Sequence, residues 1–136
     1  MSRILSIDHG EVRIGLALSD PMRIIASPFR TIKNTGDDNV LAELKEIISE
    51  NEVSLIVLGH PLGLNGQKTK KTEHVEKFLK RLNELGVPVE LYDESFSSVR
   101  AHQIIHEMGK KTGNNKEMID MIAAQVILED YMRSVQ

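Results

Sequence analysis

A change in hydrophobic period between residues 32 and 37 constrains the fold of this chain more than any other feature. Before it, three short segments with strand-like patterns, 3–8, 12–19 and 23–32, are joined by tight connections. Strands joined so closely must run antiparallel, which predicts a meander. After the change, helical and strand-like segments alternate, which is typical of parallel strands linked by helices.

The remainder of the chain predicts two further strands and four helices. Val53–Leu58 is nearly all apolar, as expected of a strand buried on both faces, and residues 87–92 form the fifth strand. Asp37 or Asp38 is the expected N-cap of the first helix, and Gly86 is expected to stop the second. Helices are expected over residues 37–51, 69–85, 96–108 and 116–133, and a basic loop over 109–115.

Together these segments predict an α/β fold with a mixed five-stranded sheet and helices on both of its faces. Strands 1, 2 and 3 would pair antiparallel, whereas strands 1, 4 and 5, which helices connect, would be parallel and central. A chain of 136 residues fits one domain, 1–136. It has no cysteine, which excludes a disulfide scaffold, a zinc ribbon and a cysteine nucleophile. No apolar run approaches a membrane span, so we expect a cytoplasmic protein without membrane contact.

Acidic residues stand where ligands usually bind in such sheets, outside the carboxyl ends of the parallel strands. Strand 1 ends at Asp8 and strand 5 ends at Asp93-Glu94. A third acid, Asp120, interrupts the apolar final helix, and a buried carboxylate is costly without a partner. One economical solution is a cation that Asp120 shares with Asp8 and Glu94. Oxygen ligands of this kind suit Mg²⁺ or Mn²⁺, and a pair of such ions could cleave a phosphodiester.

Each acid also has a purely structural interpretation. Asp8 could cap the turn at Gly10. Asp93-Glu94 could begin the following helix as an N-cap and first-turn acid. Asp120 could pair with a basic side chain. The three acids together are more persuasive than any one of them.

Basic residues near these acids are candidates for holding phosphates. Three lysines stand at the beginning of a predicted helix: Lys68, Lys70 and Lys71. Cations there interact unfavourably with the helix dipole, but they are useful beside a bound phosphate. The rest of that basic helix is interpreted as a solvated face. The net charge of −3 argues against binding nucleic acid through bulk charge and leaves room for such a local basic region.

Two further side chains lie beside the proposed site and have two interpretations each. Arg13, in the second strand, could grip a phosphate or neutralise Asp20 or Glu11. His60, at the end of the fourth strand, could orient the substrate or simply cap the strand end.

Several motifs together resemble the YqgF family, a group of Holliday-junction-resolvase-like proteins also described as pre-16S rRNA nucleases. The resemblance covers essentially the whole chain and is carried by Ser6-Ile7-Asp8-His9-Gly10, Val12-Arg13-Ile14-Gly15-Leu16-Ala17, Ser19-Asp20, Ala26-Ser27-Pro28, Val57-Leu58-Gly59-His60-Pro61, Leu64-Asn65-Gly66, Val87-Pro88-Val89, Asp93-Glu94, Ile119-Asp120-Met121-Ile122-Ala123-Ala124 and Ile127-Leu128. It implies an RNase H-like fold and metal-dependent cleavage of nucleic-acid phosphodiesters.

The resemblance also assigns roles to residues. It carries the family's acidic positions over to Asp8, Glu94 and Asp120, which would hold two Mg²⁺ or Mn²⁺ ions. Relatives usually have Arg after the Asp-Glu pair, where this chain has Ser95, and this removes a charge-assisted contact. The family's following hydroxyl pair is kept. The expected substrate-binding residues are Arg13, His60, Asn65, Lys68, Lys70, Lys71, Ser97 and Ser98.

Three functions are compatible with these residues. The first is a nuclease that processes the 5′ end of pre-16S rRNA in ribosome biogenesis, with structured RNA as partner. The second is a resolvase of branched DNA, with the same chemistry. The third is a nucleic-acid-binding module without catalysis, although an intact acid set that no longer binds metal would destabilise the fold. A monomer and a homodimer are both compatible with the sequence.

Overall fold

The computed structural model describes residues 2–93, 103, 104, 106, 107 and 116–135. Three strands come first: β1 (Arg3–His9), β2 (Arg13–Ser19) and β3 (Ala26–Lys33). The helix α1 (Asp37–Glu50) and the strand β4 (Val53–His60) follow. The expected meander and the change of period after it are therefore confirmed.

The second half contains one more strand and two long helices. A 3₁₀ turn, η1 (Leu64–Gly66), precedes α2 (Lys70–Leu82), and a second 3₁₀ turn, η2 (Asn83–Leu85), ends it. The strand β5 (Val89–Asp93) and the helix α4 (Lys116–Ser134) complete the described elements. Most of the helix expected over 96–108 and all of the loop expected over 109–115 lie outside the described residues.

The five strands form one mixed sheet in the order β3-β2-β1-β4-β5. Strands β1, β2 and β3 pair antiparallel, whereas β1 with β4 and β4 with β5 pair parallel, as predicted. The expectation that all three parallel strands are central is wrong for β5, which is the last strand of the sheet. Its alternating pattern, with Glu90 between apolar residues, fits an edge strand, while the nearly all-apolar β4 fits the interior.

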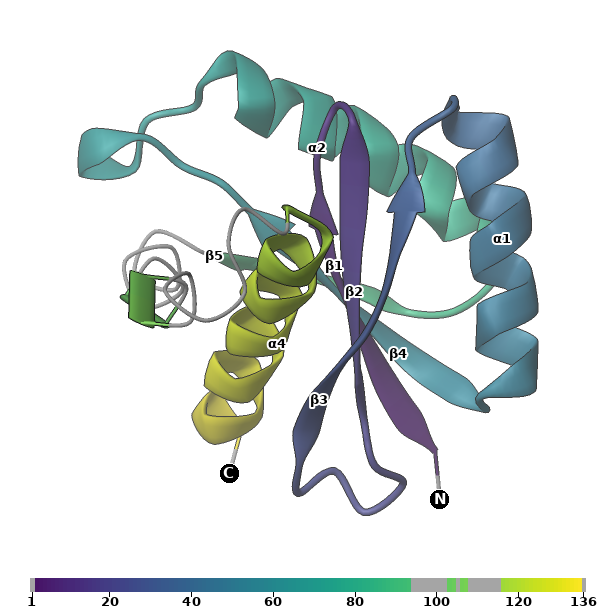
Figure 1. Cartoon of the computed structure of the whole chain (residues 1–136). Coiled ribbons are helices and arrows are strands. Elements are labelled where there is room, and N and C mark those ends of the chain that lie inside the picture. Colours follow the sequence, from purple (N-terminus) through teal and green to yellow (C-terminus); the bar gives the residue numbers. More distant parts are fainter. Residues whose placement is uncertain (1, 94–102, 105, 108–115, 136) are drawn as a thin grey trace.

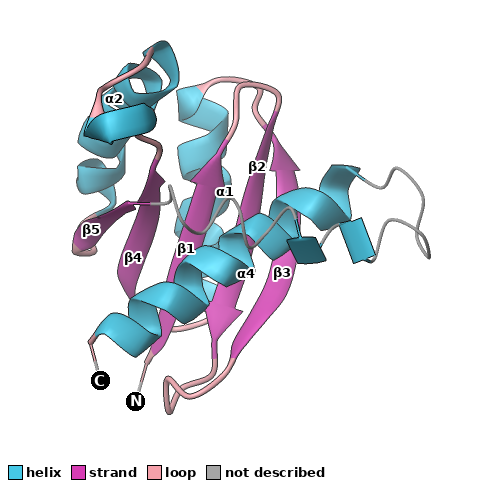
Figure 2. Ribbon diagram, turned by 90° about the vertical axis from the view of Figure 1, so that its left-hand side faces the viewer, coloured by secondary structure: helices cyan, strands magenta, loops and turns pink. Residues whose placement is uncertain are grey.

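Helices cover both faces of this sheet (Figure 1). The helices α1 and α2 pack on one face, and α4 crosses the other (Figure 2). Strand β1 serves both layers, since Leu5 and Ile7 belong to the core under α1 and α2 while Ile4 belongs to the core under α4. No described helix is long and apolar enough to cross a membrane.

The helix ends show where local sequence chemistry acts. The predicted stop at Gly86 is confirmed, because this residue adopts the left-handed conformation that glycine tolerates, with φ of 77°. The predicted N-cap of α1 at Asp37 or Asp38 is wrong. Gly36 occupies that position with φ of 114°, and both acids lie in the first turn, where they favour the helix dipole.

Candidate active site

The carboxyl ends of β1, β4 and β5 meet at one edge of the sheet. The parallel register pairs Ile7 with Leu58 and His60 with Asp93, so the three strand ends are level. Asp8 is the next-to-last residue of β1 at this edge. Glu94 follows directly after the last residue of β5, but Glu94, Ser97 and Ser98 lie outside the described residues.

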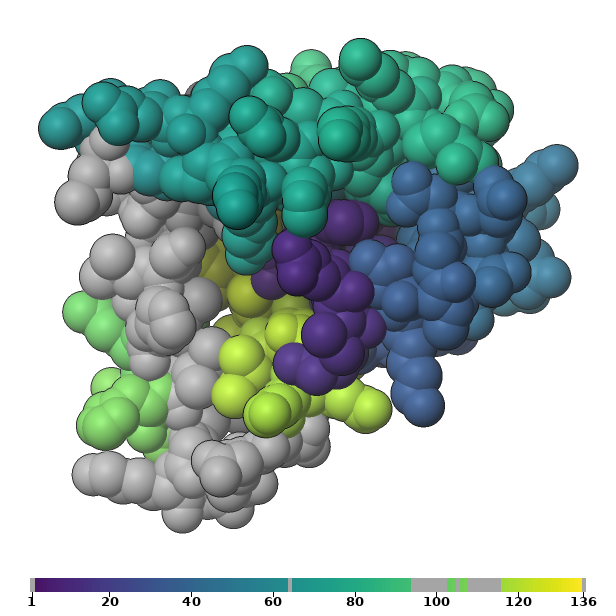
Figure 3. All heavy atoms as spheres, turned by 90° about the horizontal axis from the view of Figure 1, so that it is seen from above, coloured from purple at the N-terminus to yellow at the C-terminus, as the bar shows by residue number. Residues whose placement is uncertain are grey.

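A glycine brings the final helix close to Asp8. Gly15 of β2 pairs directly with Asp8 of β1. A Cβ atom at Gly15 would clash with the backbone carbonyl of Asp120, so the missing side chain allows α4 to lie against the sheet here. Asp120 is therefore held beside Asp8, although the two residues come from opposite ends of the chain. The start of α4, the start of α2 and the β1–β2 turn lie next to one another on this edge (Figure 3).

The two carboxylates influence each other electrostatically. Burial raises the pKa of Asp8, and the nearby negative charge of Asp120 raises it further. The ammonium group of Lys71, at the start of α2, acts in the opposite direction and lowers the pKa of Asp8. Asp8 is half-buried, so its charge is only partly compensated by water and by Lys71.

Asp120 has a direct partner of opposite charge. The Arg13 Nε atom donates to Asp120 Oδ2 over 2.7 Å, and the two side chains are 31% and 21% exposed. This confirms the interpretation that Asp120 pairs with a basic side chain, and it corrects the expected partners of Arg13. Glu11 instead contacts His74, and the Asp20 carboxylate accepts backbone N–H groups of the β2–β3 turn.

A second polar cluster lies at the end of β4. The Glu76 carboxylate on α2 contacts His60 Nε2 at 3.2 Å and Lys68 Nζ at 3.0 Å. Hydrogen bonds from Lys68 and His60 lower the pKa of Glu76. Two of the residues expected to contact substrate thus share one carboxylate, which orients them at the candidate site.

The other predicted substrate-binding residues remain open to solvent. Lys70 and Lys71 are exposed in the first turn of α2, where Thr69 and Thr72 form a capping box. Asn65 is exposed in the preceding turn and adopts a left-handed conformation with φ of 64°. These side chains can therefore reach a ligand at the edge of the sheet without any rearrangement of the core.

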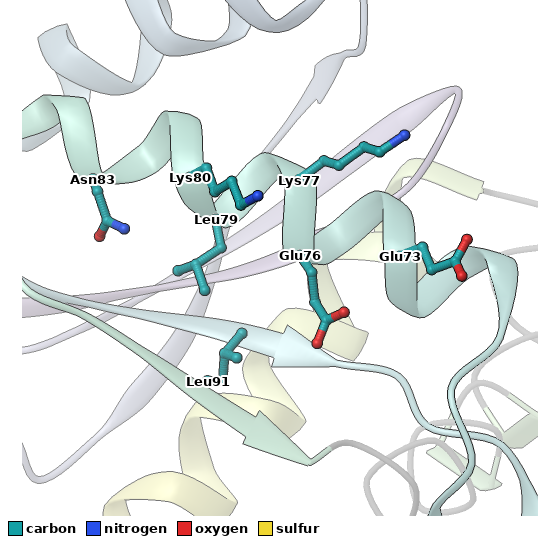
Figure 4. Close-up of a pocket in the computed structure, with 7 residues that line it drawn as sticks. All are labelled: Glu73, Glu76, Lys77, Leu79, Lys80, Asn83 and Leu91. Carbon is teal, nitrogen blue, oxygen red and sulfur yellow. The ribbon is translucent and has the colours of Figure 1, made fainter.

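A groove runs along the outer side of α2 next to β5 (Figure 4). It has a volume of about 460 Å³, and Leu79 and Leu91 approach each other across it. Glu76 lines it as well, so the groove borders the cluster of His60, Lys68 and Glu76. Its mixture of acidic and basic side chains gives it no clear preference for an anion.

Two site residues were missed by sequence reasoning. Gly15 carries a signal that could have identified it, because a lone glycine inside a strand often marks a close approach of another backbone. Glu76 carries none, since its pairing with His60 depends on how α2 packs over the end of β4.

The donor atoms at this edge suit a cation that prefers oxygen. Asp8 and Asp120 lie close enough to raise the pKa of Asp8, and a divalent ion would relieve that unfavourable interaction. Within residues 2–93, 103, 104, 106, 107 and 116–135, no three histidine, cysteine or acidic side chains gather into a metal-binding group. Of the three predicted ligands, the structure brings Asp8 and Asp120 together, whereas Glu94 lies outside the described residues.

Solved structures with the same fold include resolvases. One is RuvC of T. thermophilus in complex with a Holliday junction substrate. It is 14% identical to this chain, with a TM-score of 0.66 and coverage of 100% of this chain and 98% of that one. Another is the Fowlpox virus resolvase in complex with Holliday junction DNA, which is 14% identical with a TM-score of 0.62 and 98% coverage of each chain. At such low identity the likeness concerns the fold, which is RNase H-like as expected.

The sequence comparisons are more specific. A family model described as "RuvX: Holliday junction resolvase" matches residues 2–134. A protein of Ruminiclostridium cellulolyticum named "Putative pre-16S rRNA nuclease" is 39% identical over 132 residues, which cover 96% of this chain and 93% of that protein. One with the same name from Mycoplasma mobile is 39% identical over 135 residues, with coverage of 97% and 92%.

The fold and these comparisons together define the class of this protein: it is an RNase H-like nuclease, a hydrolase of phosphodiester bonds. Within that class the chain belongs to the RuvX family, also called YqgF. The resemblance that the sequence motifs indicated is therefore confirmed.

Proposed function

We propose that this protein is a metal-dependent nuclease whose metal ligands are Asp8, Glu94 and Asp120, binding two Mg²⁺ or Mn²⁺ ions. The observation that carries the proposal is that Asp8 and Asp120, far apart in sequence, meet at the carboxyl edge of the sheet. When bound, such ions lower the pKa of a water molecule and stabilise the leaving oxygen of a phosphodiester.

The chain's own basic and polar residues would bind and orient the nucleic acid. Lys71 is an exposed cation beside Asp8, and Lys70 precedes it, also exposed, at the start of α2. Both would hold backbone phosphates near the acids. His60 and Lys68, which both contact the Glu76 carboxylate, would also contact the substrate. The remaining proposed contacts come from Arg13, Asn65, Ser97 and Ser98.

The names of the relatives favour an rRNA precursor as the substrate. Relatives with about 39% identity over nearly the whole chain are named for pre-16S rRNA, so we assign this protein to 5′-end processing of that RNA in the cytoplasm. The second candidate is branched DNA. It is favoured by the description of the family and by the Holliday junctions bound to the two resolvases of the same fold.

One assay separates these substrates and tests the mechanism. Purified protein is incubated with a 16S precursor leader and with a four-way DNA junction, each with Mn²⁺ and with EDTA. We expect Mn²⁺-dependent cleavage of the leader near the mature 5′ end and weaker cleavage of the junction. Preferred cleavage of the junction would assign the protein to branched DNA.

Carboxylate variants test the assigned ligands. Asp8→Asn, Glu94→Gln and Asp120→Asn should each reduce cleavage by at least about 100-fold, since each removes a charge that the metal needs. Glu46→Gln is the matched control, because it removes one exposed carboxylate from α1 on the other side of the sheet. Full activity in all three site variants would refute the mechanism.

A further inference from the structure

Arg13 occupies a position from which it can act on the metal site itself. It is the first residue of β2 and lies two residues before Gly15, so both residues face the same side of the sheet. That side carries α4, and Gly15 lies directly against Asp120. The close packing at Gly15 brings Asp120 next to Asp8, and the guanidinium of Arg13 reaches the Asp120 carboxylate.

The contact between Arg13 and Asp120 is a charge-assisted hydrogen bond. The Nε–Oδ2 distance is 2.7 Å, and both side chains are more than two-thirds buried. An arginine guanidinium keeps its charge at any ordinary pH, so this bond is present whenever Asp120 is ionised. A divalent ion that uses Oδ2 of Asp120 must displace Arg13 or bind beside a fixed positive charge, and both are unfavourable.

We propose that Arg13 competes with the divalent ion for Asp120, so that the metal-free site carries its own exchangeable cation. Metal binding at Asp120 then releases the guanidinium at the same edge where Lys71 lies, and the free guanidinium becomes available to a phosphate of the substrate. This competition presupposes the proposed function, because Asp120 must be a metal ligand for it to occur.

The test is calorimetric titration of Mn²⁺ into the full-length, metal-free chain. Arg13→Gln should bind Mn²⁺ about tenfold or more tightly than the wild type, because the ion no longer has to break a charge-assisted bond. Arg13→Lys keeps the positive charge but loses the planar donor geometry, so its Kd should lie between those of Arg13→Gln and the wild type.

Arg81→Gln is the matched control. Arg81 also bonds carboxylates, with Nη2 at 2.6 Å from Asp38 Oδ1 and Nε at 2.6 Å from Glu84 Oε2, but it lies in the last turn of α2. Arg81→Gln changes the net charge by the same amount as Arg13→Gln, but at the far end of α2 from the site. It should therefore leave the Kd for Mn²⁺ unchanged. Circular dichroism of each variant checks that it is folded.

Two results would overturn the competition. One is an equal or weaker affinity for Mn²⁺ in folded Arg13→Gln, and the other is the same gain in Arg81→Gln. If the wild type binds Mn²⁺ and Arg13→Gln does so equally well, only the competition fails. If neither protein binds Mn²⁺, the metal-dependent function fails together with it.

Discussion

Asp8 is a half-buried carboxylate with a second carboxylate nearby, and in the metal-free protein this arrangement opposes folding. Because burial and Asp120 raise its pKa above the usual value of 3.8, the folded chain holds this proton more tightly than the unfolded chain. The contribution of this group to stability is fully present below pH 3.8 and is lost as pH rises through the folded pKa, so the penalty is complete only above the folded pKa.

Asp8→Asn should therefore stabilise the metal-free protein while abolishing cleavage. We expect a gain of about 1 kcal/mol in the free energy of unfolding at pH 7.5. Urea denaturation in EDTA measures it, and the gain should shrink as the pH is lowered towards 3.8. A variant that is less stable than the wild type at pH 7.5 would contradict this account of Asp8.

Asp20 shows the opposite behaviour at the far end of the sheet. Its carboxylate accepts the backbone N–H groups of Ile25 and Ile24 over 2.8 and 2.7 Å, and these bonds lower its pKa. Because the folded pKa of Asp20 is below its usual value of 3.8, the ionised carboxylate stabilises the fold above pH 3.8. This stabilisation is lost as pH falls through the folded pKa.

Asp20→Ala should consequently lower Tm by a few degrees at pH 6, with a smaller effect at pH 3. Asp20→Asn keeps one acceptor oxygen without the charge, so it should lie between the wild type and Asp20→Ala. Thermal melts of the three proteins at several pH values provide the measurement. A pH-independent difference between Asp20→Asn and the wild type would show that the charge has no part in holding this turn.

At the scale of elements, the contact between β2 and α4 positions the site. Gly15→Ala places a methyl group against the Asp120 carbonyl and must push α4 away from the sheet. Overpacking of this kind costs about 1–3 kcal/mol. We expect cleavage to fall much further than stability does, because the displaced helix carries Asp120 with it.

A stability-matched control separates these two effects. Ala17→Gly removes a fully buried methyl group from the same strand, so it weakens the core without forcing α4 outward. Assayed well below the Tm of both variants, Ala17→Gly should retain cleavage while Gly15→Ala loses it. Equal activity in the two variants would mean that the position of α4 does not control the site.

The elements were more predictable from the sequence than the contacts between them. Hydrophobic period indicated every described strand and long helix, since it reports directly which face of an element is buried. The bond between Arg13 and Asp120 spans 107 residues and depends on where α4 comes to rest along β2. No local pattern encodes that position, so Glu11 and Asp20 were equally reasonable partners for Arg13.

For the molecule as a whole, the site depends on both ends of the chain. Asp8 and Arg13 belong to the first two strands, whereas Asp120 arrives with the last described helix, which packs on β1, β2 and β3. Contacts between such distant residues cost chain entropy, which the packing of α4 on the sheet must offset. The carboxylates therefore come together only in the folded molecule, and the unfolded chain offers no preformed metal site.

The charge of the whole molecule is −3, so attraction for nucleic acid must come from a local region. Lys70 and Lys71 are exposed cations at the start of α2, where Lys71 acts on Asp8. Lys77 and Lys80 line the groove further along the same helix. If the substrate lies across the candidate site, the first pair neutralises phosphates and the second does not.

The salt dependence of binding distinguishes these two lysine pairs. Each neutralised phosphate contributes about 0.7–0.9 to the slope of log K against log salt concentration, so Lys70→Ala with Lys71→Ala should flatten the slope by about 1.5. Lys77→Ala with Lys80→Ala removes the same charge from the same helix and should leave the slope unchanged. Both slopes are measured by fluorescence anisotropy of a labelled RNA substrate. Ca²⁺ or EDTA replaces Mn²⁺ in the buffer so that the RNA stays uncleaved. An equal decrease in the two double variants would indicate diffuse attraction to α2 and remove Lys70 and Lys71 from the path of the substrate.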